Sequence, residues 1–389
     1  MGKNFVMLAK TLYGLEDLLA EELRSLGASN VERGVRSVSF EGDSGFMYKA
    51  NLCCRTAIKI LKPIKSFNVF NEDQLYSRIY DIPWEDYMQS NGTLSCESTV
   101  FSNRFSHSKY IALKTKDAIV DRFRDRTGHR PDIDRYNASL HVDIHIDRGI
   151  ATVSLNSSGP SLHKRGYRAA LVTAPINEVL AAGIVLLTGW RGQTHFLDPM
   201  CGGGTLLIEA AMIAAGIPAN INRSQFGFQL WPDYDVELFE LIRQSALNRI
   251  KEPKVAIKGY DMDEEVVYKA RQNVKAANLE EFIKVEKRDF FKSKKEQDGP
   301  LQLVFNPPYD ERLGISSIAD FYGKIGSTLK HSYPGSKAWM ITAQLEGLKS
   351  VGLRPSKKIK LYNGKLDSRL VCYELYEGSK KKGRSRSTS

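Results

Sequence analysis

The fold is decided by the stretch Leu197-Asp198-Pro199-Met200-Cys201-Gly202-Gly203-Gly204-Thr205. It follows a short apolar run, residues 194–197, and leads into an apolar, alanine-rich segment, residues 206–216. The three pieces are typical of a strand, a glycine turn and a helix N-terminus. Such a turn brings bare backbone and free N–H groups close to a ligand. The stretch therefore predicts an α/β sheet with a turn that could hold a nucleoside-bearing cofactor.

A second motif, Asn306-Pro307-Pro308-Tyr309, follows the apolar strand predicted at residues 301–305. An exocyclic amine on adenine or guanine is a poor nucleophile because its lone pair is delocalised into the ring. The Asn306 side-chain oxygen and the Pro307 carbonyl can accept its two hydrogens and direct the lone pair at an electrophilic methyl group. The prolines stiffen the loop, and Tyr309 offers a face on which the base can stack. The motif predicts metal-free methyl transfer, although two prolines also make an ordinary turn.

Acidic residues end the next two predicted strands. Asp261 follows a strand at residues 255–260, where a carboxylate can accept both hydroxyls of a ribose. Asp289 follows a strand at residues 283–286 and could accept an adenine amine, while Phe290 packs near the ring. The alternative for these acids is a helix N-cap, and Asp263 precedes a glutamate pair as a cap would.

Two other phosphate-binding motifs are excluded. A dinucleotide fingerprint requires a third glycine three residues after Gly204, where the chain has Leu207. The acidic residue of that fingerprint should lie ~20 residues after the glycine turn. Asp261 lies much further along the chain than this. No Gly-Lys-Ser/Thr sequence follows a glycine loop, so a P-loop is excluded as well.

Composition indicates an ordinary globular protein, since 42% of the 389 residues are hydrophobic and 26% are charged. No run approaches the ~18 apolar residues of a membrane span, and residues 1–5 do not resemble a signal peptide. The five cysteines form no C-x-x-C pair, so we expect no disulfide framework or zinc site and a cytoplasmic location. His141 and His145 alternate with apolar residues, which favours the polar face of a strand over a metal site.

The net charge of +11 is unevenly distributed. Five basic residues lie in the low-complexity tail, residues 379–389, which we expect to be disordered. Residues 101–168 carry 13 Lys or Arg against 7 Asp or Glu, partly interleaved with aromatic residues. This excess favours contact with nucleic acid over a merely solvated helix face.

The chain order predicts alternating strands and helices throughout. We expect a strand at residues 57–64, a hairpin across residues 141–155, and a polar, basic connector at residues 161–168. Ala174-Pro175-Ile176 is predicted to open an apolar helix, with proline in its first turn. Asn363-Gly364 is predicted to join a closing antiparallel hairpin.

Taken together, these motifs resemble the THUMP-domain class I methyltransferases, especially the ribosomal RNA guanine-N2 methyltransferase family often labelled N6-adenine-specific DNA methylases. The resemblance covers nearly the whole chain and includes Glu311-Arg312-Leu313-Gly314 after the second motif. Gly203 stands where the family usually has serine, and Asp310 where it usually has glycine. The resemblance implies four segments: a ferredoxin-like α+β subdomain (residues 1–65), a THUMP RNA-binding domain (66–160), a class I Rossmann-like methyltransferase domain with an antiparallel C-terminal hairpin (161–377), and a basic tail (378–389).

The resemblance also implies S-adenosylmethionine as the cofactor. Lys164, Arg165 and Arg168 could reach phosphate or this cofactor, or form a polar surface connector. The expected catalytic residues are Asn306, Pro307, Pro308 and Tyr309. The expected cofactor-binding residues are Asp198, Pro199, Cys201, Gly202, Gly204, Thr205, Asp261, Met262, Asp289, Phe290 and Asn306.

The leading hypothesis is methylation of the N2 amine of a guanine in 23S ribosomal RNA or a large-subunit precursor. Transfer RNA is a close alternative, because THUMP domains also occur on transfer RNA enzymes. Adenine-N6 methylation of DNA uses the same tetrapeptide motif, but the chain has no recognisable DNA target-recognition domain. A non-catalytic RNA-binding assembly factor is the alternative from another class.

Overall fold

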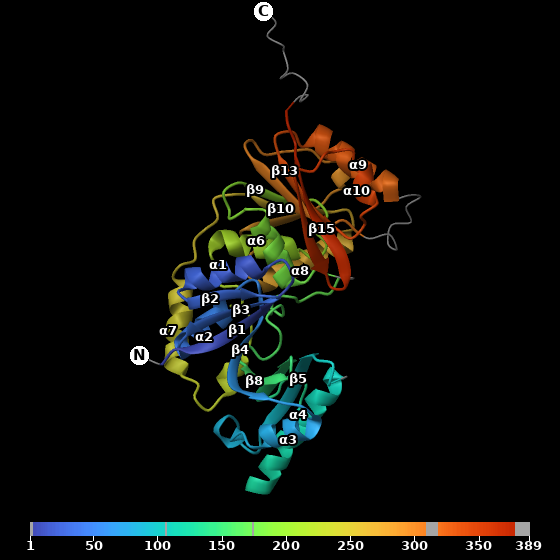
Figure 1. Ribbon diagram of the computed structural model, residues 1–389. Helices are drawn as coiled ribbons and strands as arrows, with labels where there is room; N and C mark the ends of the chain where they lie inside the picture. The colour runs from blue at the N-terminus through green and yellow to red at the C-terminus, as the bar shows by residue number, and fades with distance from the viewer. Residues whose placement is uncertain (1–2, 106, 173–174, 309–317, 378–389) are drawn as a thin grey trace, which may run out of the picture. The chain divides into compact units, whose positions relative to one another are not determined.

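The computed structural model describes residues 3–105, 107–172, 175–308 and 318–377 (Figure 1). The chain divides into two units, each with its own sheet. Unit 1 contains Met1–Lys164 and Arg223–Asn248, and unit 2 contains Arg165–Asn222 and Arg249–Ser389. Residues 223–248 lie between two parts of unit 2 in the sequence, but they pack with unit 1.

Unit 1 is built on one eight-stranded sheet, with strand order β2-β3-β1-β4-β8-β7-β5-β6. Its strands are β1 (Phe5–Thr11), β2 (Ser29–Gly34), β3 (Ser37–Gly42), β4 (Ala57–Asn68), β5 (Thr93–Phe101), β6 (Asp132–Ile133), β7 (Leu140–Asp147) and β8 (Ile150–Asn156). Its helices are α1 (Glu16–Leu26), α2 (Ser44–Cys53), α3 (Glu72–Tyr80), α4 (Ser108–Thr127) and α7 (Val236–Leu247), with 3-10 turns η1 (Trp84–Asp86) and η2 (Gly227–Leu230).

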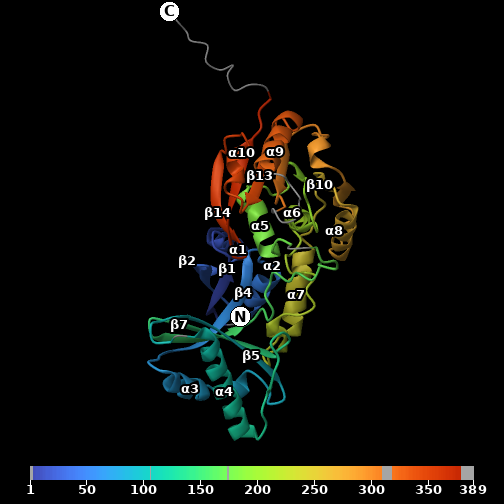
Figure 2. The same ribbon diagram turned by 90° about the vertical axis from the view of Figure 1, so that its right-hand side faces the viewer.

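The long strand β4 joins the two halves of this sheet. It pairs with β1 on one side and with β8 on the other, and it continues past the predicted end at residue 64. The extension forms because residues 65–68 keep pairing with β8 after an irregularity near Pro63. The predicted hairpin of β7 and β8 is confirmed, with Arg148 and Gly149 at positive φ in its turn. Helices α3 and α4 lie side by side in this unit (Figure 2).

Aromatic packing explains why residues 223–248 belong to unit 1. The Tyr48 ring on α2 stacks on Phe228, with ring centroids 4.4 Å apart, and it also contacts Phe239 on α7. The Arg223 guanidinium donates hydrogen bonds to backbone carbonyls of the 158–164 loop, including that of Lys164 at 2.8 Å. Residues 223–248 thus pack into unit 1 through their aromatic side chains. The sequence prediction had included them in the domain at residues 161–377.

Unit 2 is built on a seven-stranded sheet, with strand order β11-β10-β9-β12-β13-β15-β14. Its strands are β9 (His195–Asp198), β10 (Ile257–Asp261), β11 (Ile283–Lys287), β12 (Leu301–Phe305), β13 (Lys337–Thr342), β14 (Lys357–Asn363) and β15 (Leu366–Glu374). Its helices are α5 (Glu178–Leu187), α6 (Thr205–Ala215), α8 (Glu264–Ala276), α9 (Ile318–Ser332) and α10 (Gly347–Ser350), with the 3-10 turn η3 (Phe290–Lys292). The β11-to-β13 part is parallel, and β15 and β14 are antiparallel.

This topology confirms the predicted α/β class with its closing hairpin. The order reverses between β9 and β12, and ligands bind in such sheets where the order reverses, outside the carboxyl ends of the strands. Asn363 pairs with Leu366, so the two turn residues are Gly364 and Lys365 rather than Asn363 and Gly364.

The predicted start of α5 is wrong. The helix begins at Glu178 instead of in the 174–176 segment, because the Asn177 side chain accepts a hydrogen bond from the Leu180 N–H and caps the first turn. Pro175 precedes the cap and lies outside the helix. The N-terminus of α5 is thereby fixed by asparagine rather than by proline.

The packing of α9 on α10 depends on a glycine. A Cβ added to Gly326 would lie 1.7 Å from the Val351 carbonyl oxygen, a backbone atom that follows α10. We expect Gly326→Ala to lower the free energy of unfolding by about 3 kcal/mol or more, because the two elements must separate. Gly323→Ala, on the same helix, is the matched control.

At Gly323 the added Cβ would meet only the Ser350 carbonyl oxygen at 3.6 Å, which is an ordinary contact. We expect that variant to gain about 0.5–1 kcal/mol from the lower chain entropy of alanine. Urea unfolding of both variants measures the difference. Equal stability of the two would contradict the packing described here.

Candidate active site

A cavity of about 430 Å³ opens at the carboxyl ends of β9, β10 and β12 in unit 2. It brings together the two motifs that the sequence separates by about a hundred residues. The lining residues are Val172, Pro175, Ile176, Asp198, Pro199, Met200, Cys201, Gly202, Gly203, Thr205, Leu206, Asp261, Met262, Asp263, Val266, Arg288, Asp289, Phe290, Phe291, Asn306, Pro307, Pro308 and Phe321.

The glycine turn has the backbone conformation that its sequence requires. Gly202 and Gly204 have φ angles of 51° and 81°, in the left-handed region that favours glycine. Gly204 is the N-cap of α6, and the Cys201 N–H donates to the Tyr260 carbonyl at 2.8 Å. The turn is therefore held against the end of β10, and its Gly202 and Gly203 line the cavity.

Asp261 lies at the end of β10 and lines the cavity beside the glycine turn. Its carboxylate accepts the Gly202 N–H and the Asp263 N–H, each at 3.1 Å. Burial raises the pKa of Asp261, and the backbone hydrogen bonds oppose that shift. A carboxylate in this position organises the turn and has further acceptor capacity for the hydroxyls of a ligand.

Asp198 ends β9 and is almost completely buried, at 1% exposure. It accepts the Met200 N–H at 3.2 Å. Burial raises the pKa of Asp198 well above its usual range, and the nearby Asp261 carboxylate adds to the rise. Both carboxyl groups line the same cavity, and a ligand that carries positive charge would favour their ionised forms.

The raised pKa of Asp198 predicts a stability cost at neutral pH. The native state holds this proton more tightly than the unfolded chain, whose carboxyl titrates near 3.8. Stability from this group is therefore complete below that value and is lost as pH rises toward the native pKa. We expect cofactor-free Asp198→Asn to have a higher free energy of unfolding than the wild type at neutral pH.

The gap between the two proteins should close as pH falls to about 4, because the carboxyl of the wild type is then neutral in the unfolded chain as well as in the native state. Urea unfolding of both proteins at several pH values measures this difference in unfolding free energy. The amide oxygen that the Asp198→Asn substitution introduces can still accept the Met200 N–H, so this hydrogen bond is kept. A variant less stable than the wild type at neutral pH would contradict this account.

Asp263 and Asp289 both cap helical turns while they line the cavity. Asp263 accepts the Glu265 N–H at 2.9 Å at the start of α8, and Asp289 accepts the Phe291 N–H at 2.9 Å at the start of η3. The capping alternative is therefore correct for Asp263. Phe290 is buried at 3% exposure and lines the cavity from β11's side of the sheet.

Asn306, Pro307 and Pro308 follow β12 and line the cavity, with Pro307 buried. Tyr309, Asp310 and residues 311–314 lie outside the described residues. Asn306 and Pro307 thus share one cavity with the glycine turn and Asp261. The two predicted motifs, far apart in the sequence, therefore line the same cavity.

Family models match three successive parts of the chain. A family model of the RMKL-like methyltransferase domain, UPF0020, matches residues 165–371. The chain belongs to the UPF0020 methyltransferase family. A model of the RlmL ferredoxin-like domain matches residues 6–61 of the chain, and a model of the THUMP domain matches residues 69–156. The predicted resemblance and fold class are confirmed.

Individual relatives agree with the family. The chain is 39% identical over 377 residues to "Ribosomal RNA large subunit methyltransferase K/L" of Syntrophotalea carbinolica, covering 94% of this chain and 53% of that relative. It thus spans about half the length of the curated relatives it matches.

Two solved structures share nearly the whole fold. SMU.472 in complex with SAH has a TM-score of 0.85 at 29% identity and covers 97% of this chain and 100% of its own. A protein from Listeria monocytogenes str. 4b F2365, described as a predicted N6-adenine-specific DNA methylase, has a TM-score of 0.84 at 28% identity, covering 96% and 97%. The methyltransferase family and the SAH-bound structure support the expected cofactor, S-adenosylmethionine.

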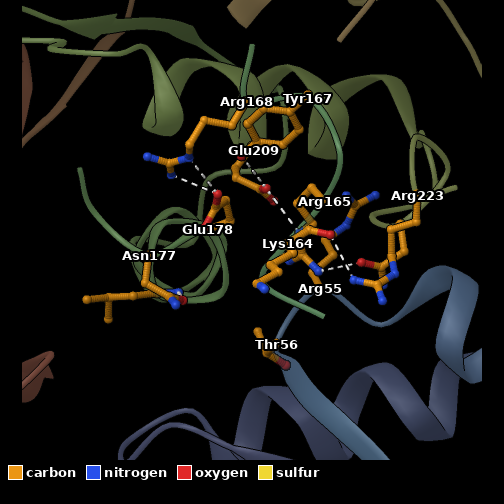
Figure 3. A network of polar contacts seen from close by, with 12 residues as sticks. Arg55, Thr56, Lys164, Arg165, Tyr167, Arg168, Asn177, Glu178, Glu209 and Arg223 are labelled. Atoms are coloured by element: carbon orange, nitrogen blue, oxygen red, sulfur yellow. Dashed lines mark hydrogen bonds and ion pairs between the residues drawn. The ribbon is translucent and has the colours of Figure 1, made fainter. Parts of the chain in front are cut away.

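The structure corrects the predicted role of the basic connector. Arg165 is buried at 1% exposure and donates to Glu209 at 3.3 Å and to Asn220 at 2.9 Å. Arg168 pairs with Glu178 at 2.7 Å. Figure 3 shows both guanidinium groups turned toward these carboxylates, so they hold unit 2 together instead of reaching a phosphate. Lys164 belongs to unit 1 and lies 5.9 Å from the Tyr136 ring.

Sequence reasoning also missed one wall of the cavity. Val172, Pro175 and Ile176 line it from the segment that precedes α5. The apolar run at residues 169–172, which follows the basic connector, was a signal that could have indicated this wall. Gly204, by contrast, was expected to bind cofactor but is not among the lining residues, and it is the N-cap of α6.

Metal-binding clusters and membrane-spanning helices are both absent from the described ranges. There, no group of three or more His, Cys, Asp or Glu side chains could hold a metal ion. In the same ranges, every helix is too short or too polar to cross a membrane.

Proposed function

We propose that this protein transfers a methyl group from S-adenosylmethionine to the exocyclic N2 amine of a guanine in 23S ribosomal RNA or a large-subunit precursor. The observation that carries the proposal is the shared cavity. It joins the glycine turn and Asp261, suited to a nucleoside, to Asn306 and Pro307, suited to a planar amine.

The cofactor would lie along the ends of β9, β10 and β11. Asp261 would accept ribose hydroxyls while it holds the Gly202 N–H, and Asp289 with Phe290 would contact the adenine. Asp198 would face the charged amino-acid end. When bound, S-adenosylmethionine supplies a methyl group made electrophilic by its sulfonium.

Asn306 and Pro307 would then activate the amine. The Asn306 side-chain oxygen and the Pro307 carbonyl accept its two hydrogens, so the nitrogen lone pair turns out of the ring plane and toward the methyl group. A nitrogen–carbon bond forms as the sulfur–carbon bond breaks, and the extra proton on nitrogen passes to solvent. Pro308 limits the motion of this loop.

The substrate class is inferred from the N-terminal part of the chain and from the relatives. The THUMP match covers residues 69–156, and the basic excess lies within residues 101–168. The curated relatives are named as large-subunit ribosomal RNA methyltransferases. Transfer RNA, DNA adenine and a non-catalytic assembly role are the alternatives.

Transfer of tritium from labelled S-adenosylmethionine to three substrates tests the proposal. The substrates are 23S ribosomal RNA that lacks the modification, transfer RNA and unmethylated DNA. We expect label in ribosomal RNA alone. Label in DNA or transfer RNA would overturn the substrate, and no label in any of them with cofactor bound would favour an assembly role.

A further inference from the structure

The segment Arg165–Val172 is fixed to unit 2 by buried polar contacts at its N-terminal end. Glu209, fully buried on α6, accepts hydrogen bonds from Arg165 at 3.3 Å and from the Tyr167 hydroxyl at 2.9 Å (Figure 3). The first turn of α6 lines the cavity through Thr205 and Leu206. The start of the segment is therefore tied to the helix that begins at the glycine turn.

The other end of the segment is held by one side chain, Asn273 of α8. Asn273 is buried at 4% exposure, and its Oδ1 accepts the Ala170 N–H at 2.8 Å. Its Nδ2 donates to the Ala170 carbonyl at 3.2 Å and to the Gly203 carbonyl at 3.0 Å. One amide thus satisfies both backbone groups of Ala170 and joins that residue to the glycine turn.

The two residues that Asn273 brings together belong to the cavity wall. Gly203 lines the cavity, and so does Val172, two residues after Ala170. The Val172 side chain packs closely against the Gly203 backbone, because a Cβ at Gly203 would lie 3.0 Å from Val172 Cγ2. Asn273 itself is outside the set of lining residues. It can therefore act on a bound molecule only by fixing the spacing of these two walls.

We propose that Asn273 is a positioning residue for cofactor binding, which sets the spacing between the glycine turn and the Arg165–Val172 segment. The inference rests on the proposed function, in which this cavity binds S-adenosylmethionine. Without the Asn273 amide, the backbone of Ala170 loses both partners and the segment is free to move away from Gly203. In such a variant, part of the binding free energy must be used to order the segment, which is already ordered in the wild type.

The test is calorimetric titration with S-adenosylhomocysteine of the wild type and three variants of the full chain. We expect Asn273→Ala to raise the dissociation constant by about 10- to 30-fold, since it removes three hydrogen bonds that preorganise the cavity. Asn273→Asp should weaken binding at least as much. Its carboxylate can accept the Ala170 N–H but cannot donate to the carbonyls of Ala170 and Gly203.

Lys275→Ala is the matched control, because Lys275 is exposed on the same helix. We expect it to bind like the wild type. In steady-state assays, Asn273→Ala should raise the KM for S-adenosylmethionine with kcat at saturation nearly unchanged. A purely structural defect would lower the amount of active protein and leave the KM unaltered.

Hydrogen exchange of the Ala170 amide keeps the inference testable if a variant fails to fold. Because coupling is reciprocal, S-adenosylhomocysteine should slow that exchange in the wild type. An unchanged dissociation constant in folded Asn273→Ala, or exchange at Ala170 that does not respond to the ligand, would overturn the inference alone. A wild type that does not bind S-adenosylhomocysteine would instead overturn the proposed function.

Discussion

Asn306→Ala is expected to lower kcat by about 10³-fold, because the variant lacks one of the two acceptors that turn the amine lone pair toward the methyl group. The dissociation constant for S-adenosylhomocysteine should stay nearly the same, since the amide acts on the substrate amine. Single-turnover methyl transfer and calorimetric titration measure the two quantities separately.

Asn248→Ala is the matched control for this variant. Asn248 is exposed after α7, in the other unit from the cavity. We expect full activity from it. If Asn306→Ala retained activity within a factor of about ten, the amine-activation mechanism would be wrong.

Asp261→Ala is expected to raise the dissociation constant for S-adenosylhomocysteine by about 100-fold or more. The substitution removes the acceptor proposed for the ribose hydroxyls. It also releases the Gly202 N–H that the carboxylate holds at 3.1 Å, so the glycine turn keeps its Cys201–Tyr260 backbone hydrogen bond to β10 but loses this second contact. Calorimetry on the purified variant measures the loss.

Asp235→Ala is the control for the loss of a structural aspartate. Asp235 caps α7 in unit 1, where its side chain accepts the Leu238 N–H at 2.9 Å. We expect this variant to lose about 1 kcal/mol of stability and to keep its ligand affinity. Unchanged affinity in Asp261→Ala would contradict both roles, the acceptor for ribose hydroxyls and the support of the glycine turn.

The parallel sheet and most of its cavity could be predicted because the signals are local. A strand, a glycine turn and a helix are contiguous at residues 194–216, and strand-end acids occupy the same edge in any parallel sheet. The positive φ angles of Gly202 and Gly204 follow from residue type. Asp263 was harder to assign, since a cap and a ligand contact need the same residue at the same position.

Long-range partners could not be predicted. In the sequence, Arg165 is one of several basic residues in a run typical of a protein surface. Its burial is explained by its partners Glu209, 44 positions later, and Asn220. The packing of residues 223–248 on unit 1 depends on Tyr48, 180 positions before Phe228, in a stacked pair that no local pattern marks. The sequence around Asn273 predicts only a helix. The role of its side chain depends on contacts with Ala170 and Gly203, which are distant in the sequence.

The most direct test of the central claim is the identity of the nucleoside that the protein methylates. Ribosomal RNA would be incubated with the wild-type protein and S-adenosylmethionine, digested to nucleosides and separated by chromatography with mass detection. We expect N2-methylguanosine from the wild type, and we expect Asn306→Ala to form none. Methyl groups found on a ring nitrogen, on ribose or on the N6 amine of adenosine would contradict it.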